Sequence, residues 1–130
     1  MISGDHLLGR ISLYYDYGWS PDPVGEFLDS LELVAGLDAR LCLSGHGKPF
    51  VDLPAHIEGN RALVRERLRA TLSGLTDGPR KVIDLATIVR GGEVRISNAH
   101  WWLNETLCYL THLERKGQVA RAGEQDWVLA

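Results

Sequence analysis

Two short apolar runs, each followed directly by a glycine-bounded turn, constrain the fold of this chain most. Residues 1 to 3 lead into Gly4 and Asp5, and residues 39 to 43 lead into a turn that contains His46. Apolar runs of this length that end in such turns predict buried strands. Each strand therefore presents a side chain capable of chemistry directly after its carboxyl end.

Two helices are predicted around the second strand. Asp22 and Pro23 begin a run with apolar residues at helical spacing that ends near Gly36. Asp52 and Pro54 begin a longer helix, which carries arginines four residues apart on its outer face: Arg61, Arg65 and Arg69. Strand, helix, strand and helix form an α/β pattern.

Asp5 and His46 are the side chains to weigh for chemistry. Loops that follow the strands of a parallel or mixed α/β sheet converge at one edge, where ligands usually bind. A carboxylate and an imidazole that meet there can hold a divalent metal, and zinc is the first choice for mixed nitrogen and oxygen ligands. Turn formation or plain solvent exposure is the alternative that these residues leave open.

The second half of the chain has a different pattern. The letters TDGPR predict a turn at residues 76 to 80, and a short helix follows at residues 81 to 90. Ser97 or Asn98 is expected to cap a third helix that stops before Gly117, and a hairpin with arms at residues 119 to 121 and 127 to 129 closes the chain. The long helix that begins at Pro54, these two helices and the hairpin together describe a winged helix, which consists of three helices followed by a hairpin. We therefore expect one domain at residues 1 to 60 and a second at residues 61 to 130.

The charge distribution supports the same division. Residues 1 to 60 carry three basic and nine acidic side chains, whereas residues 61 to 130 carry eleven basic and eight acidic ones. A nucleic acid partner is one possibility, and Arg61, Arg65, Arg69 and Arg115 are then the candidate phosphate contacts. Glu105 and Glu114 oppose the basic end of the third helix. A packing or RNA-contacting module is therefore favoured over specific DNA recognition.

Composition narrows the class of protein further. The first ten residues place Asp5 and His6 where a secretory signal needs an apolar run, and no stretch approaches the roughly 18 apolar residues of a membrane span. Cys42 and Cys108 stand far apart in apolar settings, which excludes a disulfide framework and favours a core role for Cys42. We expect a cytoplasmic protein that has no membrane partner.

The stretch SGDHLLG, followed about forty residues later by LCLSGHGKP, a basic helix and a winged helix, resembles one hydrolase family. It is similar to the metallo-beta-lactamase fold hydrolases of the beta-lactamase-like protein 2 type, some of which act on nucleic acid and others on small thioesters or lactones. The resemblance implies two zinc ions, with Asp5 as the bridging ligand and His46 as a terminal ligand of one ion.

The chain also departs from the pattern of that family. Members carry an HxHxDH motif and a further histidine before the GD turn, and these are absent from the 130 residues. The resemblance therefore implies the C-terminal part of a zinc-dependent hydrolase, inactive alone because two ligands are too few. The competing hypothesis is a binding module for nucleic acid or protein.

The predicted fold class is α/β: an incomplete metallo-beta-lactamase αββα half, followed by a small α+β winged-helix domain. In such a half, the apolar face of the helix at residues 23 to 36 lacks part of the sheet that would cover it. An open strand edge and an uncovered apolar face both favour association. We therefore expect a homo-oligomer joined through residues 1 to 50.

Overall fold

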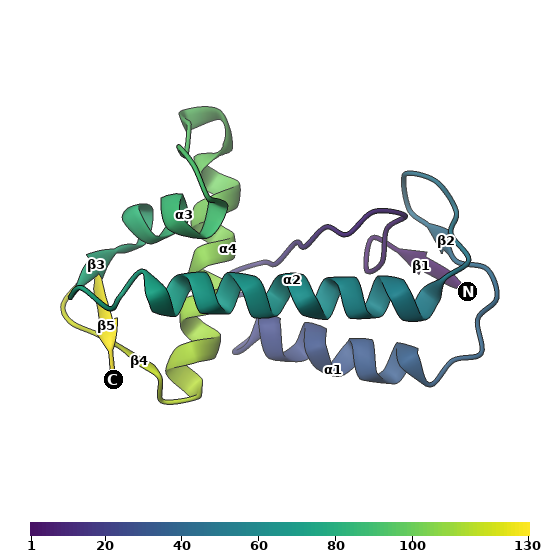
Figure 1. Ribbon diagram of the computed structural model, residues 1–130, viewed down its shortest axis with the longest axis horizontal. Coiled ribbons are helices and arrows are strands. Elements are labelled where there is room, and N and C mark those ends of the chain that lie inside the picture. The colour runs from purple at the N-terminus through teal and green to yellow at the C-terminus, as the bar shows by residue number, and fades with distance from the viewer. The chain divides into compact units, whose positions relative to one another are not determined.

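The computed structural model describes all residues from 1 to 130, in the element order shown in Figure 1. Its contacts divide the chain into a first unit, Met1–Tyr14 with Glu26–Arg65, and a second unit, Tyr15–Gly25 with Glu66–Ala130. The division falls within helices α1 (Pro23–Ala35) and α2 (Leu53–Ser73), so both helices contribute residues to both units. None of the helices combines the length and the apolar character needed to cross a membrane.

The first unit contains a two-stranded parallel sheet. Strand β1 (Ile2–Gly4) pairs with β2 (Leu43–Ser44), with Ile2 opposite Leu43 and Gly4 opposite Ser44. Strand β2 is shorter than predicted. Cys42, which was expected within the strand, instead forms an antiparallel bridge with Phe50, and the two backbone hydrogen bonds measure 2.8 and 3.1 Å. The chain thus folds back on itself directly after the turn at residues 44 to 47.

The core of the first unit joins α1 to the start of α2. Leu31 and Cys42 are fully buried, which agrees with the core role expected for Cys42. On the apolar face of α1, Leu31 is covered by this core, contrary to the expected lack of cover, whereas Phe27, Leu28 and Val34 are only partly buried. Full burial of a side chain such as Leu31 contributes about 1.5–3 kcal/mol. The cluster consists of Leu7, Leu31, Cys42, Phe50, Leu53 and Ile57, with Met1, Phe27, Leu28, Val34 and Ala39 packed against it.

Local capping accounts for the predicted helix starts. The Asp22 carboxylate accepts a hydrogen bond of 2.9 Å from the backbone of Gly25, and the Asp52 carboxylate accepts one of 3.0 Å from the backbone of Ala55. Each satisfies an N–H group that has no partner within its helix. Both caps are therefore confirmed where the sequence placed them.

The second unit combines two helices with a three-stranded antiparallel sheet. Helices α3 (Val82–Arg90) and α4 (Ile96–Arg115) precede the hairpin of β4 (Val119–Arg121) and β5 (Asp126–Leu129). The predicted turn at residues 76 to 80 is only partly right, because Arg80 and Lys81 form β3 and pair with the outer side of β5. The core between these elements consists of Leu75, Leu85, Leu110, Leu113, Val119 and Trp127.

Helix α4 begins earlier than predicted. Its first residue is Ile96, and neither Ser97 nor Asn98 precedes it as a cap. Instead, the Asn98 side chain lies within the first turn and accepts a hydrogen bond of 3.0 Å from the Arg95 backbone. A short amide side chain can reach the N–H group ahead of the helix from inside the first turn as well as from the cap position, and this explains the displaced boundary.

Glu105 is buried within the second unit, contrary to its expected role opposite the basic end of α4. Only 5% of the surface of Glu105 is exposed to solvent. The Tyr109 hydroxyl donates a hydrogen bond of 2.5 Å to the carboxylate, and the Trp101 indole donates one of 3.2 Å. Burial raises the pKa of Glu105, while these hydrogen bonds and the charge of Arg67 oppose that rise.

The raised pKa of Glu105 predicts a pH-dependent stability difference. A carboxyl whose pKa is raised by folding stabilises the fold below its unfolded pKa of about 4.3, and that contribution is lost as pH rises through the folded value. Gln cannot ionise, so the free energy of unfolding of Glu105→Gln relative to the unsubstituted protein is expected to improve between pH 4 and pH 7. Urea unfolding followed by tryptophan fluorescence measures it, because all four tryptophans belong to the second unit.

Glu114→Gln is the matched control, since Glu114 is an exposed glutamate on the same helix. The difference between that variant and the unsubstituted protein should stay nearly constant with pH. A difference for Glu105→Gln that stays constant or becomes more unfavourable as pH rises would contradict the prediction.

Candidate functional site

The parallel strands of the first unit bring Asp5 and His46 together. The Leu43 backbone donates to Met1 at 2.9 Å, and the Gly45 backbone donates to Gly4 at 2.7 Å, so the pairing continues into both turns. The Asp5 carboxylate and His46 Nε2 lie 3.6 Å apart, and both side chains are exposed. The two residues that the sequence singled out as metal ligands thus lie side by side, as expected.

A glycine allows this close approach. A Cβ atom built onto Gly45 would collide with the Asp5 carboxylate and approach the Gly4 carbonyl carbon to 3.2 Å. Any side chain at residue 45 would therefore displace Asp5 or open the strand pairing. The close approach of the two turns therefore explains why residue 45 is a glycine.

The geometry of the pair fits two ligands of one metal ion. Ligands of a tetrahedral zinc, each about 2.1 Å from the ion, lie about 3.4 Å apart, close to the observed separation. However, no group of three or more His, Cys, Asp or Glu side chains in the chain could hold a metal. A zinc site needs three or four protein ligands. The residues present therefore do not fit a complete zinc site, and no reaction step can be derived through a metal from them.

The neighbouring histidines are engaged elsewhere. His6 Nε2 lies 3.2 Å from the Ser30 hydroxyl, its ring packs edge-on against Phe27, and burial lowers the pKa of this imidazole. His56 stacks on Phe50 at a ring separation of 3.9 Å. In the second unit, His112 Nδ1 lies 3.0 Å from both carboxylate oxygens of Asp22. These contacts thus join all three rings to partners other than the Asp5 and His46 pair.

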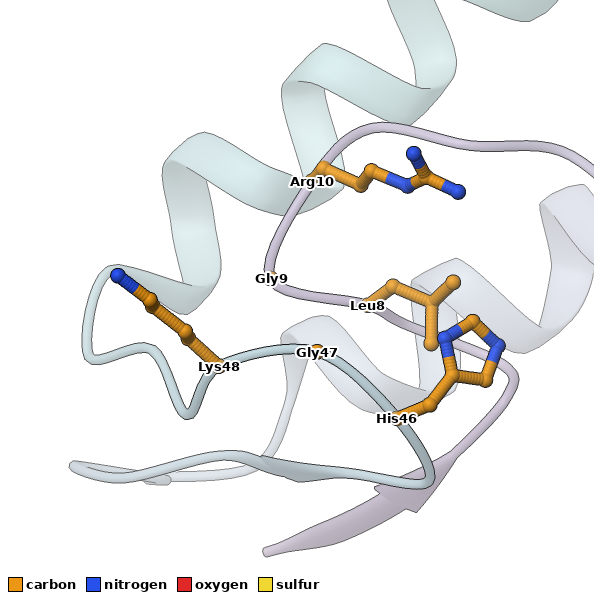
Figure 2. A pocket seen from close by; sticks show the side chains of 6 residues that line it. All are labelled: Leu8, Gly9, Arg10, His46, Gly47 and Lys48. Carbon is orange, nitrogen blue, oxygen red and sulfur yellow. The ribbon is translucent and has the colours of Figure 1, made fainter.

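A cavity of about 330 Å³ opens beside His46. It is lined by Leu8, Gly9, Arg10, His46, Gly47 and Lys48, as Figure 2 shows. Gly9 lets the two lining segments meet, because a Cβ atom there would collide with the Lys48 carbonyl. Sequence reasoning missed Arg10 and Lys48. The scarcity of basic residues in the first sixty positions is the signal that could have found them.

The four arginines proposed as phosphate contacts are engaged to different degrees. Arg61 pairs with Glu32 at 2.6 Å and Arg65 with Glu58 at 2.5 Å, both within the first unit. In the second unit, Arg69 is exposed, and Arg115 Nε lies 3.9 Å from the Asp22 carboxylate. Ion pairs with carboxylates compete with phosphate for the same guanidinium donors. Nucleic acid binding through these four residues stays a prediction.

Two solved structures resemble this chain over nearly its whole length. A Beta-lactamase domain protein from Burkholderia ambifaria matches with a TM-score of 0.88 and 28% sequence identity, over 99% of this chain. A metallo-beta-lactamase family protein from Thermus thermophilus matches with a TM-score of 0.86 and 29% identity, again over 99% of this chain. The fold is that of metallo-beta-lactamase proteins. It corresponds to only part of that fold, because the chain spans 41% of the length of each of these two proteins.

The two other comparisons gave no match. No family profile and no curated protein matches this sequence. The predicted α/β fold class is confirmed by the structural matches. The finer resemblance to the beta-lactamase-like protein 2 type stays a prediction.

The contact between Gly45 and Asp5 predicts the effect of a single added methyl group. Gly45→Ala should displace the Asp5 carboxylate and destabilise the first unit by about 1 kcal/mol, because the Cβ atom also crowds the Gly4 carbonyl carbon at 3.2 Å. Urea unfolding followed by circular dichroism measures the change, and the backbone resonances of residues 4, 5 and 46 should move in the same variant.

Gly36→Ala is the control, since a Cβ atom there meets only the Leu33 carbonyl at 3.4 Å, an ordinary contact. That substitution should cost less than Gly45→Ala. Equal stability for Gly45→Ala and the unsubstituted protein would show that the turn has room that the geometry denies it.

Proposed function

We propose that this chain is the C-terminal part of a zinc-dependent metallo-beta-lactamase fold hydrolase of the beta-lactamase-like protein 2 type. Asp5 and His46 supply two of its metal ligands, and the remaining ligands come from residues outside this sequence. The observation that carries the proposal is the Asp5 and His46 pair, 3.6 Å apart at the carboxyl ends of two parallel strands. The structural matches support it, because they span nearly all of this chain and 41% of each neighbour.

In this hydrolase, the task of Asp5 and His46 is to hold two ligand groups in place. Zinc in a hydrolase polarises the bond that is cleaved and lowers the pKa of a bound water. Asp5 and His46 alone hold a carboxylate and an imidazole in place, and the strand pairing with Gly45 keeps them there. The 130 residues are therefore proposed to be inactive on their own. The coding sequence upstream of Met1 tests the proposal: an in-frame HxHxDH motif there supports it, and its absence argues for a remnant or a split protein.

Residues 61 to 130 are proposed to be a winged-helix domain. The support is the order of α3, α4 and the β4 and β5 hairpin, with β3 completing an antiparallel sheet. Binding of nucleic acid or protein by this domain is the alternative function. The ion pairs of Arg61, Arg65 and Arg115 count against these three arginines as its phosphate contacts.

Metal content is the first quantity that the proposal predicts. The purified chain should hold well under one zinc per chain after dialysis, because the loss of most ligands removes most of the binding free energy. Metal analysis by mass spectrometry measures the stoichiometry. Asp38→Ala and His100→Ala, which change exposed residues outside the pair, are the controls for Asp5→Ala and His46→Ala. Stoichiometric zinc that disappears only with Asp5→Ala or His46→Ala would show that a second copy completes the site.

The proposal also predicts that the chain associates with itself through residues 1 to 50. Ile2 is 83% exposed and Leu33 is 77% exposed, and the two-stranded sheet leaves one edge of β1 and one of β2 unpaired. Exposed apolar side chains and open strand edges favour association. The chain alone is therefore expected to be a dimer or larger in light scattering. The double substitution Ile2→Lys with Leu33→Lys should shift it toward the monomer.

Ile96→Lys is the matched control, because Ile96 is 99% exposed but belongs to the second unit. It should leave the mass unchanged. A monomeric, folded chain before any substitution would contradict the expected interface.

A further inference from the structure

The cavity beside His46 concentrates positive charge in an acidic part of the chain. Residues 1 to 60 contain only three basic side chains, Arg10, Arg40 and Lys48. Two of these three, Arg10 and Lys48, line this one cavity together with His46. The nine acidic residues of the same stretch contribute none of its lining. The Asp5 carboxylate lies 3.6 Å from Nε2 of His46 but does not line the cavity.

The two cations of the cavity have no carboxylate partners. Arg61 and Arg65, in the same unit, bind Glu32 and Glu58 at 2.6 and 2.5 Å. No ion pair or hydrogen bond of the Arg10 or Lys48 side chain occurs in the structure, and both residues are exposed. A guanidinium that is held at a cavity without a protein partner keeps all its donors available for a ligand.

The side chains differ in where they point. In Figure 2, Arg10 extends above Leu8 on the side where the His46 ring lies, whereas Lys48 turns away from both. The backbones of the two segments approach closely at Gly9, where a Cβ atom would collide with the Lys48 backbone carbonyl. Arg10 is therefore the better placed of the two to contact a molecule in the cavity, and Leu8 offers that molecule an apolar surface.

We propose that this cavity binds an oxyanion, a carboxylate or a phosphate group, with Arg10 as its principal ligand and Lys48 as a weaker electrostatic contributor. The planar guanidinium matches both groups, because it donates two parallel hydrogen bonds to paired oxygens. The identification of this oxyanion as part of the substrate rests on the proposed hydrolase function. The substrate class is then a molecule that carries a carboxylate or phosphate near the bond that is cleaved beside His46.

Anion titration of the metal-free chain tests the inference. Sodium phosphate and sodium acetate are added separately at constant ionic strength, and ¹H–¹⁵N spectra follow the backbone amides of residues 8 to 10 and 46 to 48. Saturable shifts at these residues are expected with at least one anion, and the anion that binds more tightly identifies phosphate or carboxylate as the preferred group. Arg10→Gln should weaken that binding about tenfold or more, since it removes charged hydrogen bonds. Lys48→Gln should weaken it less.

Arg40→Gln is the matched control, because Arg40 is an exposed arginine of the same unit outside the cavity. It should leave the affinity unchanged, and Arg10→Lys should fall between the two arginine-to-glutamine variants. Absence of saturable shifts with both anions, or equal weakening by Arg10→Gln and Arg40→Gln, would overturn the inference. The titration contains no metal, so anion binding together with no upstream HxHxDH motif would leave the anion site standing, while the chain would then be a remnant or one part of a split protein.

Discussion

The parallel pairing of Ile2–Gly4 with Leu43–Ser44 is the contact on which the candidate site depends. It joins segments about forty residues apart, and its hydrogen bonds continue to Gly45, directly before His46. Asp5 and His46 directly follow the paired segments, so a change in this register would move the two side chains relative to each other. The site thus exists only when the first unit is folded in this register, which also brings the turn beside the segment that carries Arg10.

Some cationic side chains of the first unit are paired with carboxylates, whereas those at the cavity are not. Glu32 and Glu58 neutralise two of its arginines at the surface of α2, and exposed pairs of this kind contribute little stability. Arg10 and Lys48 stay unpaired beside His46. In the second unit, by contrast, the carboxyl group of Glu105 is buried, and Tyr109 and Trp101 donate hydrogen bonds to it. The proposed metal ligands Asp5 and His46 and the cationic cavity would together suit an anionic substrate, whereas Glu105 is enclosed within the second unit.

Sequence reasoning succeeded where a feature depends on neighbours along the chain. The caps formed by Asp22 and Asp52 and the β4 and β5 hairpin occur as predicted, because a cap or a tight turn is completed within a few residues. It failed where a distant segment decides. The pairing of Arg80 with Trp127 turns a predicted loop into β3, and the cluster that contains Phe50 buries Leu31 on a face of α1 that was expected to lack cover.

The sequence by itself determined the α/β order, the starts of α1 and α2 and the choice of Asp5 and His46 as candidate ligands, since spacing and turn chemistry act locally. Only the tertiary structure decided that these two lie 3.6 Å apart, that Glu105 is buried, and that Arg10 and Lys48 share a cavity with His46. Distances between residues far apart in sequence depend on strand register and on core packing. Both are set by many weak contacts at once, which no local pattern of residues records.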